Sequence, residues 1–210
     1  MRLILLIAVL AAFAVGNGAV IAQNESKPTA DSNVRKVKPF IEIWSTTFTE
    51  IKEFPDLSNY RGDAERGAYV LRLAGCATCH TAPKGGKFLA GGRELKSPFG
   101  SFFPPNITPD TETGIGSWSV QDFVRAVQFG KSPRGRPYYP AFPYTSYSRM
   151  ALQDIVDLKA YLDTVEPVRN PVPDHKLGFP FSIRAGMSIW RALFFDTEVP
   201  SSRTGPSDAW

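Results

Sequence analysis

The sequence predicts one mainly α domain, built from short helices and long loops rich in proline and glycine, with an extension at each end. Three observations support this prediction. Four segments carry apolar residues at helical spacing between helix start and stop signals. Eighteen prolines and seventeen glycines among 210 residues leave room for only short regular elements. The third observation is the motif Cys76-Ala77-Thr78-Cys79-His80, which contains both cysteines of the sequence.

This motif predicts covalent attachment of a c-type haem, because the spacing of the cysteines and the histidine directly after them are typical of such sites. One turn of backbone places the thiols of Cys76 and Cys79 where they can add to two vinyl groups of a porphyrin. His80 then lies beneath the iron as an axial ligand. A backbone carbonyl, from Pro83 or Pro105, is expected to orient the other ring nitrogen of His80. We therefore expect one haem c, packed among short helices and long loops.

Other uses of the motif remain open at this point. A Cys-x-x-Cys pair also serves in thiol–disulfide exchange, and two cysteines can form a structural disulfide. The pair could also be half of a zinc site, although the sequence has no second Cys/His pair that would complete four ligands. An export signal and a candidate sixth ligand favour the haem.

Residues 1–22 predict export from the cytoplasm. A basic start at Arg2 is followed by an apolar run and by small residues up to Ala22, as in a secretory signal peptide. Val20 makes the cleavage site imperfect, and the segment is also long enough to remain as an uncleaved membrane anchor. Both alternatives place the folded part in the periplasm, either soluble after cleavage or tethered to the inner membrane.

Three further regions follow the leader. Residues 23–60 combine a polar tether with an apolar stretch that packs against the domain or docks to a partner. Residues 61–167 form the predicted haem-binding domain. Residues 168–210 form a C-terminal extension, in which 185–195 predict a short amphipathic helix that lies on the domain or docks to a partner or a membrane surface.

Helix signals mark three segments inside the predicted domain. The first spans 63–74, ends at Gly75 and leads directly into the motif. The second spans 119–130 and opens with a Ser-x-x-Asp capping box. The third runs from about 151 to 165, before Pro167.

Two loops between these helices are the predicted walls of the haem crevice. Residues 84–117 contain consecutive prolines, which force an extended path, and residues 131–150 are dense in proline and aromatic side chains. Candidates to wall the pocket or bind the haem propionates lie in or beside these loops: Pro105, Asn106, Trp118, Arg136, Tyr138, Tyr139 and Tyr144.

Met150 is the predicted sixth ligand of the iron. Met1 belongs to the leader and Met187 to the C-terminal extension, whereas Met150 ends the aromatic loop directly before the third helix. A thioether ligand favours ferrous iron and raises the reduction potential. His175 is the rival, because a second histidine would give a centre of lower potential, although its charged and proline-rich surroundings favour a surface position.

The residues around the motif resemble class I cytochrome c. The resemblance rests on Gly67 in the first helix, the Cys-x-x-Cys-His motif, the later Met150 and Tyr161 in the last helix. It implies that the first and last helices cross near Gly67 and Tyr161. Over residues 98–195 the chain further resembles the cytochrome c domains of bacterial periplasmic dehydrogenases, such as those for alcohol and gluconate.

The chain departs from this family pattern in two places. Phe142 stands where many members have a methionine, which removes one candidate ligand and leaves Met150. Ala151 follows Met150 where family helices begin with serine or threonine, so the usual N-cap of the third helix is expected to be lost or altered.

The predicted function is that of a monohaem c-type cytochrome, an electron-transfer protein and not an enzyme. It would carry single electrons between a periplasmic dehydrogenase or other respiratory donor and another cytochrome or terminal oxidase. The net charge of +4 favours acidic partners or an anionic membrane, and no nucleic-acid motif is present. Two alternatives remain: a haem peroxidase, which needs an open sixth position, and a non-shuttling haem subunit that anchors or assembles a membrane-associated oxidoreductase.

Overall fold

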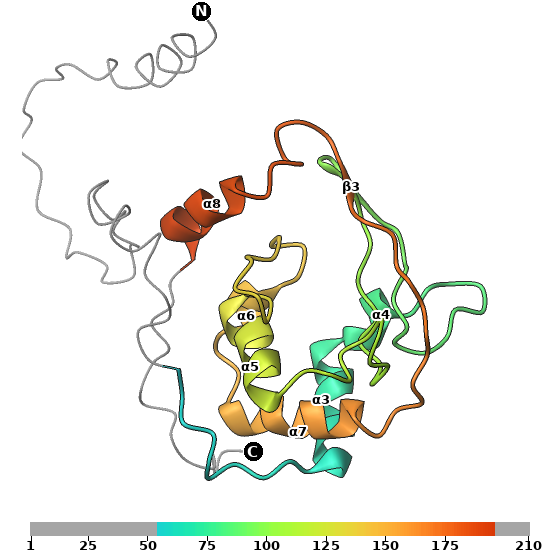
Figure 1. Ribbon diagram of the computed structural model, residues 1–210, viewed down its shortest axis with the longest axis vertical. Helices are drawn as coiled ribbons and strands as arrows, with labels where there is room; N and C mark the ends of the chain where they lie inside the picture. Colours follow the sequence, from blue (N-terminus) through green and yellow to red (C-terminus); the bar gives the residue numbers. More distant parts are fainter. Residues whose placement is uncertain (1–53, 196–210) are drawn as a thin grey trace, which may run out of the picture. The chain divides into compact units, whose positions relative to one another are not determined.

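The computed structural model describes residues 54–195, which form a helix-rich architecture with few strands (Figure 1). The elements in chain order are α3 (Ala64–Ala74), α4 (Cys76–His80), β1 (Leu95–Ser97), β2 (Gly100–Phe102), α5 (Val120–Phe129), α6 (Tyr144–Tyr147), α7 (Leu152–Leu162), β3 (Lys176–Leu177) and α8 (Gly186–Phe194). The prediction of short helices joined by long loops is confirmed. The predicted leader, the tether and the chain after residue 195 lie outside the described residues. No helix among the described ones combines the length and the apolar character needed to cross a membrane.

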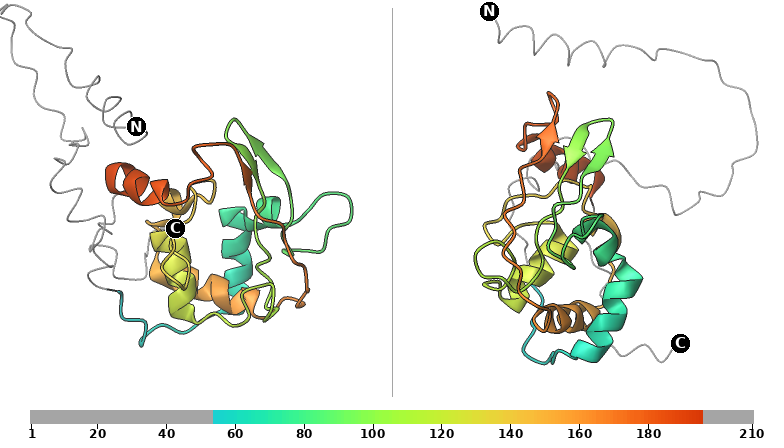
Figure 2. Two further views of the ribbon diagram at one scale, coloured as in Figure 1. Left: turned by 45° about the horizontal axis from the view of Figure 1, so that its top comes forward. Right: turned by 90° about the vertical axis from the view of Figure 1, so that its right-hand side faces the viewer.

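Helices α3 and α7 cross in direct contact at Gly67 (Figures 1 and 2). A Cβ atom on Gly67 would lie 2.0 Å from the backbone oxygen of Asp157 and 2.8 Å from the Cβ of Tyr161. Only glycine therefore allows the two helices to approach this closely. The crossing near Gly67 and Tyr161, which the family resemblance implied, is confirmed.

A buried carboxylate, that of Asp157 on α7, fixes the start of α3 to this crossing. It accepts hydrogen bonds from the backbone N–H of Asp63 at 2.9 Å and from Nε2 of Gln153 at 2.7 Å. It also pairs with Arg66, whose guanidinium reaches Asp154 as well. Asp63 in turn caps α3, because its side chain accepts from the N–H of Arg66. The buried charge is thus surrounded by donors, as a buried charge must be.

Helix α5 packs against α6 and α7 and supplies much of the core. The predicted capping box is present: Ser119 accepts from the N–H of Asp122, whose carboxylate accepts from the N–H of Ser119. Gly130 ends the helix in the left-handed conformation, with φ of 57°. The core cluster draws on α3, α5, α7 and the loops between them: Val70, Leu71, Leu89, Ile115, Phe123, Val124, Val127, Phe129, Ile155, Leu158 and Leu162.

Helix α7 differs from its predicted bounds at its C-terminal end. It ends at Leu162 rather than near 165, because Thr164 donates to the carbonyl of Tyr161 and Val165 to that of Leu162. These bonds span three residues, so the last turn tightens and the α-helix stops before the proline. At the other end Ala151 makes no side-chain capping bond, as its sequence predicted.

Three features of the fold were not predicted. Residues 84–117 contain the hairpin β1–β2, in which Leu95 pairs with Phe102, and the extension adds β3 antiparallel to β2. Strands of two or three residues are too short to show an alternating pattern. Gly100 permits this pairing, because a Cβ there would lie 2.2 Å from the carbonyl oxygen of Lys176. The single turn α6 was also missed, since it begins after Pro143 in a loop without helix signals.

The predicted C-terminal helix is present as α8, and its orientation is unusual. Arg191 is buried, whereas Ile189 and Leu193 are 60% and 45% exposed. The charged residue of the helix therefore faces inward and two of its large apolar residues face outward.

Candidate functional site

The Cys-x-x-Cys-His motif is a single helical turn that follows α3 without a loop. Gly75 closes α3 in the left-handed conformation, with φ of 68°, and turns the chain directly into α4. Cys76 and Cys79 lie on this one turn, and neither is in a disulfide. The two thiols are therefore held close together by local structure alone.

The imidazole of His80 is oriented by a backbone carbonyl. Its Nδ1 lies 2.7 Å from the carbonyl oxygen of Pro105, one of the two carbonyls expected from the sequence. Because a carbonyl only accepts, Nδ1 carries the proton and donates it, which leaves the lone pair on Nε2 for a metal. Burial lowers the pKa of His80, and the hydrogen bond to Pro105 opposes this effect in part. A neutral imidazole with a free Nε2 is the form that binds iron.

Close backbone packing holds Pro105 in place against the histidine. The N–H of Gly91 donates to the carbonyl of His80 at 2.7 Å, and that of Gly92 donates to the carbonyl of Pro104 at 2.9 Å. Gly91 has φ of 76°, and a Cβ on it would lie 2.5 Å from the carbonyl carbon of Pro105. Glycine is thus needed where the loop passes beneath Pro105.

Asn106, a predicted pocket residue, acts inside the loop instead. Its Nδ2 donates to Thr113 Oγ1 at 3.0 Å and to the carbonyl of Val168 at 2.6 Å. Its Oδ1 accepts from the backbone N–H and the hydroxyl of Thr108. Both ends of this buried amide are therefore engaged, so it braces the loop that carries Pro105 and has no free donor for a cofactor.

The environment of Cys76 disfavours the thiol–disulfide alternative. Burial raises the pKa of Cys76 to about 11, and the neighbouring Cys79 adds to this shift. Catalytic Cys-x-x-Cys pairs need a thiol with a lowered pKa, because the thiolate is the nucleophile. At neutral pH Cys76 is a protonated thiol, which suits a covalent anchor better than a redox nucleophile.

The segment that carries Met150 is tied to the motif and to α5. The hydroxyl of Tyr147 donates to the carbonyl of Ala74 at 2.7 Å, close to Cys76. The N–H of Met150 donates to the carbonyl of Tyr147 at 2.9 Å, and its own carbonyl accepts from Nε2 of the buried Gln128 at 3.0 Å. The Met150 side chain is partly buried against the core. The sequence analysis did not single out Tyr147 or Gln128, although a polar residue on the apolar face of a helix was a visible signal for Gln128.

Two predicted pocket residues, Tyr138 and Tyr144, belong to one aromatic cluster. The ring of Phe142 lies 5.8 Å from that of Tyr138, 6.2 Å from that of Tyr144 and 5.9 Å from that of Tyr147. Burial raises the pKa of both Tyr138 and Tyr147 to about 12. We call these four residues the aromatic cluster; Phe142 is at its centre, and Tyr144 and Tyr147 lie on the single turn α6.

The remaining predicted pocket residues lie elsewhere. Tyr139 is buried at the sheet, where its hydroxyl donates to the carbonyl of Phe181 at 3.1 Å. Trp118 packs against the core beside α5, and the side chain of Arg136 is exposed. The structure thus does not bring these three together with Tyr138 and Tyr144.

His175 is half-buried rather than on the surface, because the extension folds back on β2. Its ring lies 5.4 Å from that of Phe102 and 5.7 Å from that of Tyr139. The backbone N–H of Phe103 donates to its Nδ1 at 3.2 Å. Burial and the nearby Arg184 lower the pKa of His175, so the ring is neutral at neutral pH. A neutral imidazole has one lone pair, and here a hydrogen bond occupies it, which disfavours His175 as an iron ligand.

The residues at the motif fit a covalently bound haem. Two cysteines that form no disulfide lie on one turn, followed by an oriented histidine with a free Nε2. Among the buried side-chain atoms of residues 54–195, the hydroxyl of Tyr144 and Nη1 of Arg191 have no hydrogen-bond partner. Such donors fit a cofactor that carries two carboxylates. Within the same residues, no group of three or more His, Cys, Asp or Glu side chains could hold a metal ion.

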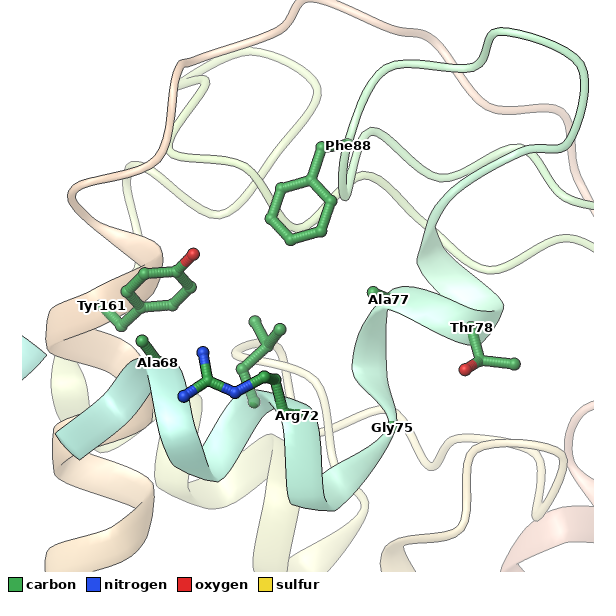
Figure 3. Close-up of a pocket in the computed structure, with 8 residues that line it drawn as sticks. Ala68, Arg72, Gly75, Ala77, Thr78, Phe88 and Tyr161 are labelled. Atoms are coloured by element: carbon green, nitrogen blue, oxygen red, sulfur yellow. The ribbon is translucent and has the colours of Figure 1, made fainter. Parts of the chain in front are cut away.

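A separate pocket of about 390 Å³ borders the motif on the side of Ala77 and Thr78 (Figure 3). The side chains of Phe88, Tyr161 and Arg72 surround its open space. Cys76, Cys79 and His80 are not part of its lining, so it is distinct from the side of the motif that carries the two thiols and the imidazole.

Comparison with known proteins finds no matching family model but several relatives. The chain is 42% identical over 156 residues to a dihaem c-type cytochrome of Cereibacter sphaeroides, a match that covers 72% of this chain and 52% of that protein. It is 43% identical over 135 residues to the fructose dehydrogenase cytochrome subunit of Gluconobacter japonicus, covering 64% of this chain and 28% of the relative. It is 40% identical over 147 residues to the cytochrome c subunit of a quinone alcohol dehydrogenase of Gluconobacter oxydans, covering 69% of this chain and 30% of the relative. The chain thus spans about half or less of the length of these curated relatives.

Proposed function

We propose that this chain, a c-type cytochrome that resembles the cytochrome subunits of bacterial dehydrogenases, carries one electron at a time between two protein partners. The observation that carries the proposal is the hydrogen bond from His80 Nδ1 to the Pro105 carbonyl beside two cysteines on one turn. It fixes the tautomer and direction that an axial ligand needs. The names of the relatives agree with a role in electron transfer rather than in substrate chemistry.

The proposed cofactor is one haem c in a class I cytochrome c fold, since the printed sequence carries one attachment motif. The iron of a bound haem gains and loses a single electron. Cys76 and Cys79 would hold the macrocycle through thioethers, and Nε2 of His80 would bind the iron. The Pro105 carbonyl keeps the proton on Nδ1 and makes the imidazole a stronger donor.

Met150 is the proposed sixth ligand. Two hydrogen bonds support this proposal, because they fix the backbone of Met150 to Tyr147 and to the side chain of Gln128. The rival ligand His175 is disfavoured, because its lone pair already accepts a hydrogen bond. A segment held from both sides can present a thioether without reorganising when the iron changes oxidation state. With His80 and Met150 as ligands, the iron would have no open position. A haem peroxidase needs such a position, so this coordination would exclude that alternative.

Substitution of Met150 tests the ligand assignment directly. The Met150→His holoprotein should lose the thioether-to-ferric charge-transfer band and have a lower reduction potential, because a second imidazole stabilises ferric iron. Met187→His, at the second methionine of the described residues, is the matched control and should keep the charge-transfer band. If the band survives in Met150→His, or disappears in Met187→His, then Met150 is not the sixth ligand of the iron.

The proposed site of action is the periplasmic side of the inner membrane, with a dehydrogenase as the electron donor. Support comes from the leader sequence and from the names of the relatives, which are cytochrome subunits of fructose and alcohol dehydrogenases. Because those relatives are longer subunits, a fixed haem subunit of a complex is the second candidate. Gentle membrane extraction separates the two: a stoichiometric partner, and no electron exchange by the isolated chain, would support the fixed subunit over a shuttle.

A further inference from the structure

The inward position of Arg191 on α8 requires an explanation. Its side chain is only 9% exposed, although two neighbours on the same helix, Ile189 and Leu193, face outward. Burying a guanidinium removes a permanent charge from water, which is unfavourable unless an anion compensates it. The helix could have placed an apolar residue inward at no such cost.

The described surroundings of Arg191 contain aromatic rings but no carboxylate partner. The guanidinium carbon lies 5.3 Å from the ring centre of Tyr144 and 4.7 Å from that of Phe195. Cation–π contacts compensate only part of the desolvation. None of the ion pairs formed within residues 54–195 includes Arg191, and its Nη1 has no hydrogen-bond partner. The hydroxyl of the fully buried Tyr144 is likewise without a partner.

The Arg191 guanidinium and the Tyr144 hydroxyl lie close together, because each partly offsets the pKa shift that burial causes in the other. Burial lowers the pKa of Arg191 and raises that of Tyr144, so the unfavourable environment affects both. A single carboxylate could accept from both groups and neutralise the guanidinium charge. The structure thus offers a partly built anion site where Arg191 of α8 meets Tyr144 of α6.

The closeness of this site to the motif favours a carboxylate of the haem as the anion. Tyr144 and Tyr147 lie on the single turn α6, and the hydroxyl of Tyr147 donates to the carbonyl of Ala74, close to Cys76. In a c-type haem the vinyl-derived thioethers and the two propionates occupy opposite edges of the macrocycle. A haem held at Cys76 and Cys79 would therefore carry its propionates on the edge away from the cysteines, where buried donors such as those of Arg191 and Tyr144 could bind them.

We propose that Arg191 and Tyr144 bind a haem propionate, with Arg191 donating through its guanidinium and Tyr144 through its hydroxyl. The inference rests on the proposed function, because it needs the covalent haem. It makes α8, and with it the C-terminal extension, part of the cofactor site. Arg191 is then a positioning residue that holds the edge of the haem opposite the thioethers and contributes a positive charge near the iron.

The experiment uses the full-chain holoprotein and compares Arg191→Gln with Arg184→Gln. Arg184 is the matched control, because it lies in the same extension, stacks 5.0 Å from the ring centre of Tyr139 and is exposed. Resonance Raman spectroscopy reports the propionate bending mode, and redox titration reports the potential. Arg191→Gln should shift the mode and lower the potential, since loss of a buried cation favours ferric iron. Arg184→Gln should keep the wild-type mode and change the potential less.

Two further variants keep the test decisive if Arg191→Gln yields little holoprotein. Arg191→Lys retains the charge and should restore most of the potential, while the mode stays shifted because the guanidinium geometry is lost. Tyr144→Phe should shift the mode alone. The proposal would be overturned if Arg191→Lys and Tyr144→Phe both kept the wild-type propionate bending mode. It would also be overturned if Arg191→Gln and Arg184→Gln had the same reduction potential. An absent Soret band in the wild type would instead reject the proposed function itself.

Discussion

Single polar contacts between distant parts of the sequence position the candidate site. The motif itself is local, so its cysteines and histidine can be singled out from the sequence directly. The Pro105 carbonyl was one of two expected partners of His80. In contrast, the bonds from Tyr147 to Ala74 and from Gln128 to Met150 join residues 73 and 22 positions apart. No local pattern encodes such pairs, because only the folded chain brings them together.

At the crossing of α3 and α7, loss of the Asp157 carboxylate should reduce the stability of the fold the most. Asp157→Ala leaves the N–H of Asp63, the Gln153 amide and part of the Arg66 guanidinium without their acceptor. We expect the free energy of unfolding of the holoprotein to fall by about 2–3 kcal/mol, measured by urea titration. Asp154→Ala is the control, because Asp154 is partly exposed and pairs only with Arg66; it should cost about 1 kcal/mol or less. Equal losses in the two variants would contradict this account.

Helices were predicted well where their ends carry local signals. The capping box at Ser119 and the left-handed glycines Gly75 and Gly130 are short-range features, and all three have the expected geometry. The end of α7 was misplaced because its last turn tightens without a glycine. The sheet escaped prediction because β3 pairs with a hairpin more than seventy residues earlier, in strands too short to show a pattern.

The crossing of α3 and α7 depends on the absence of a side chain at Gly67. In Gly67→Ala the new Cβ would clash with the backbone of Asp157, so the helices must separate. The expected loss in the free energy of unfolding is about 3 kcal/mol, measured by urea titration.

Gly186→Ala is the matched control for this substitution. Gly186 begins α8, its φ is not in the left-handed region, and nothing lies within 4 Å of a Cβ built there. Alanine also has the higher helix propensity, so stability should stay the same or rise by up to about 1 kcal/mol. An unchanged midpoint in Gly67→Ala would show that the two helices do not need this close approach.

Across the described residues, the C-terminal extension is joined to the region around the motif at several points. β3 pairs with β2, the N–H of Val168 donates to the hydroxyl of Thr108 at 3.1 Å, and α8 brings Arg191 against Tyr144. The sequence left open whether the helix of residues 168–210 lies on the domain or docks to a partner or membrane, because composition cannot reveal which loops a tail will cover. The boundary near 167 stays a prediction, but the proposed cofactor site draws on both sides of it.

The central claim is that the exported chain binds one haem covalently and exchanges one electron. The most direct measurement is the intact mass of the full-length gene product, purified from a bacterium able to mature c-type cytochromes, together with a redox titration of its Soret absorption. We predict the mass of the mature polypeptide plus one haem, and a single reversible one-electron transition. A polypeptide with the mass of its apoprotein and no Soret absorption would contradict the account.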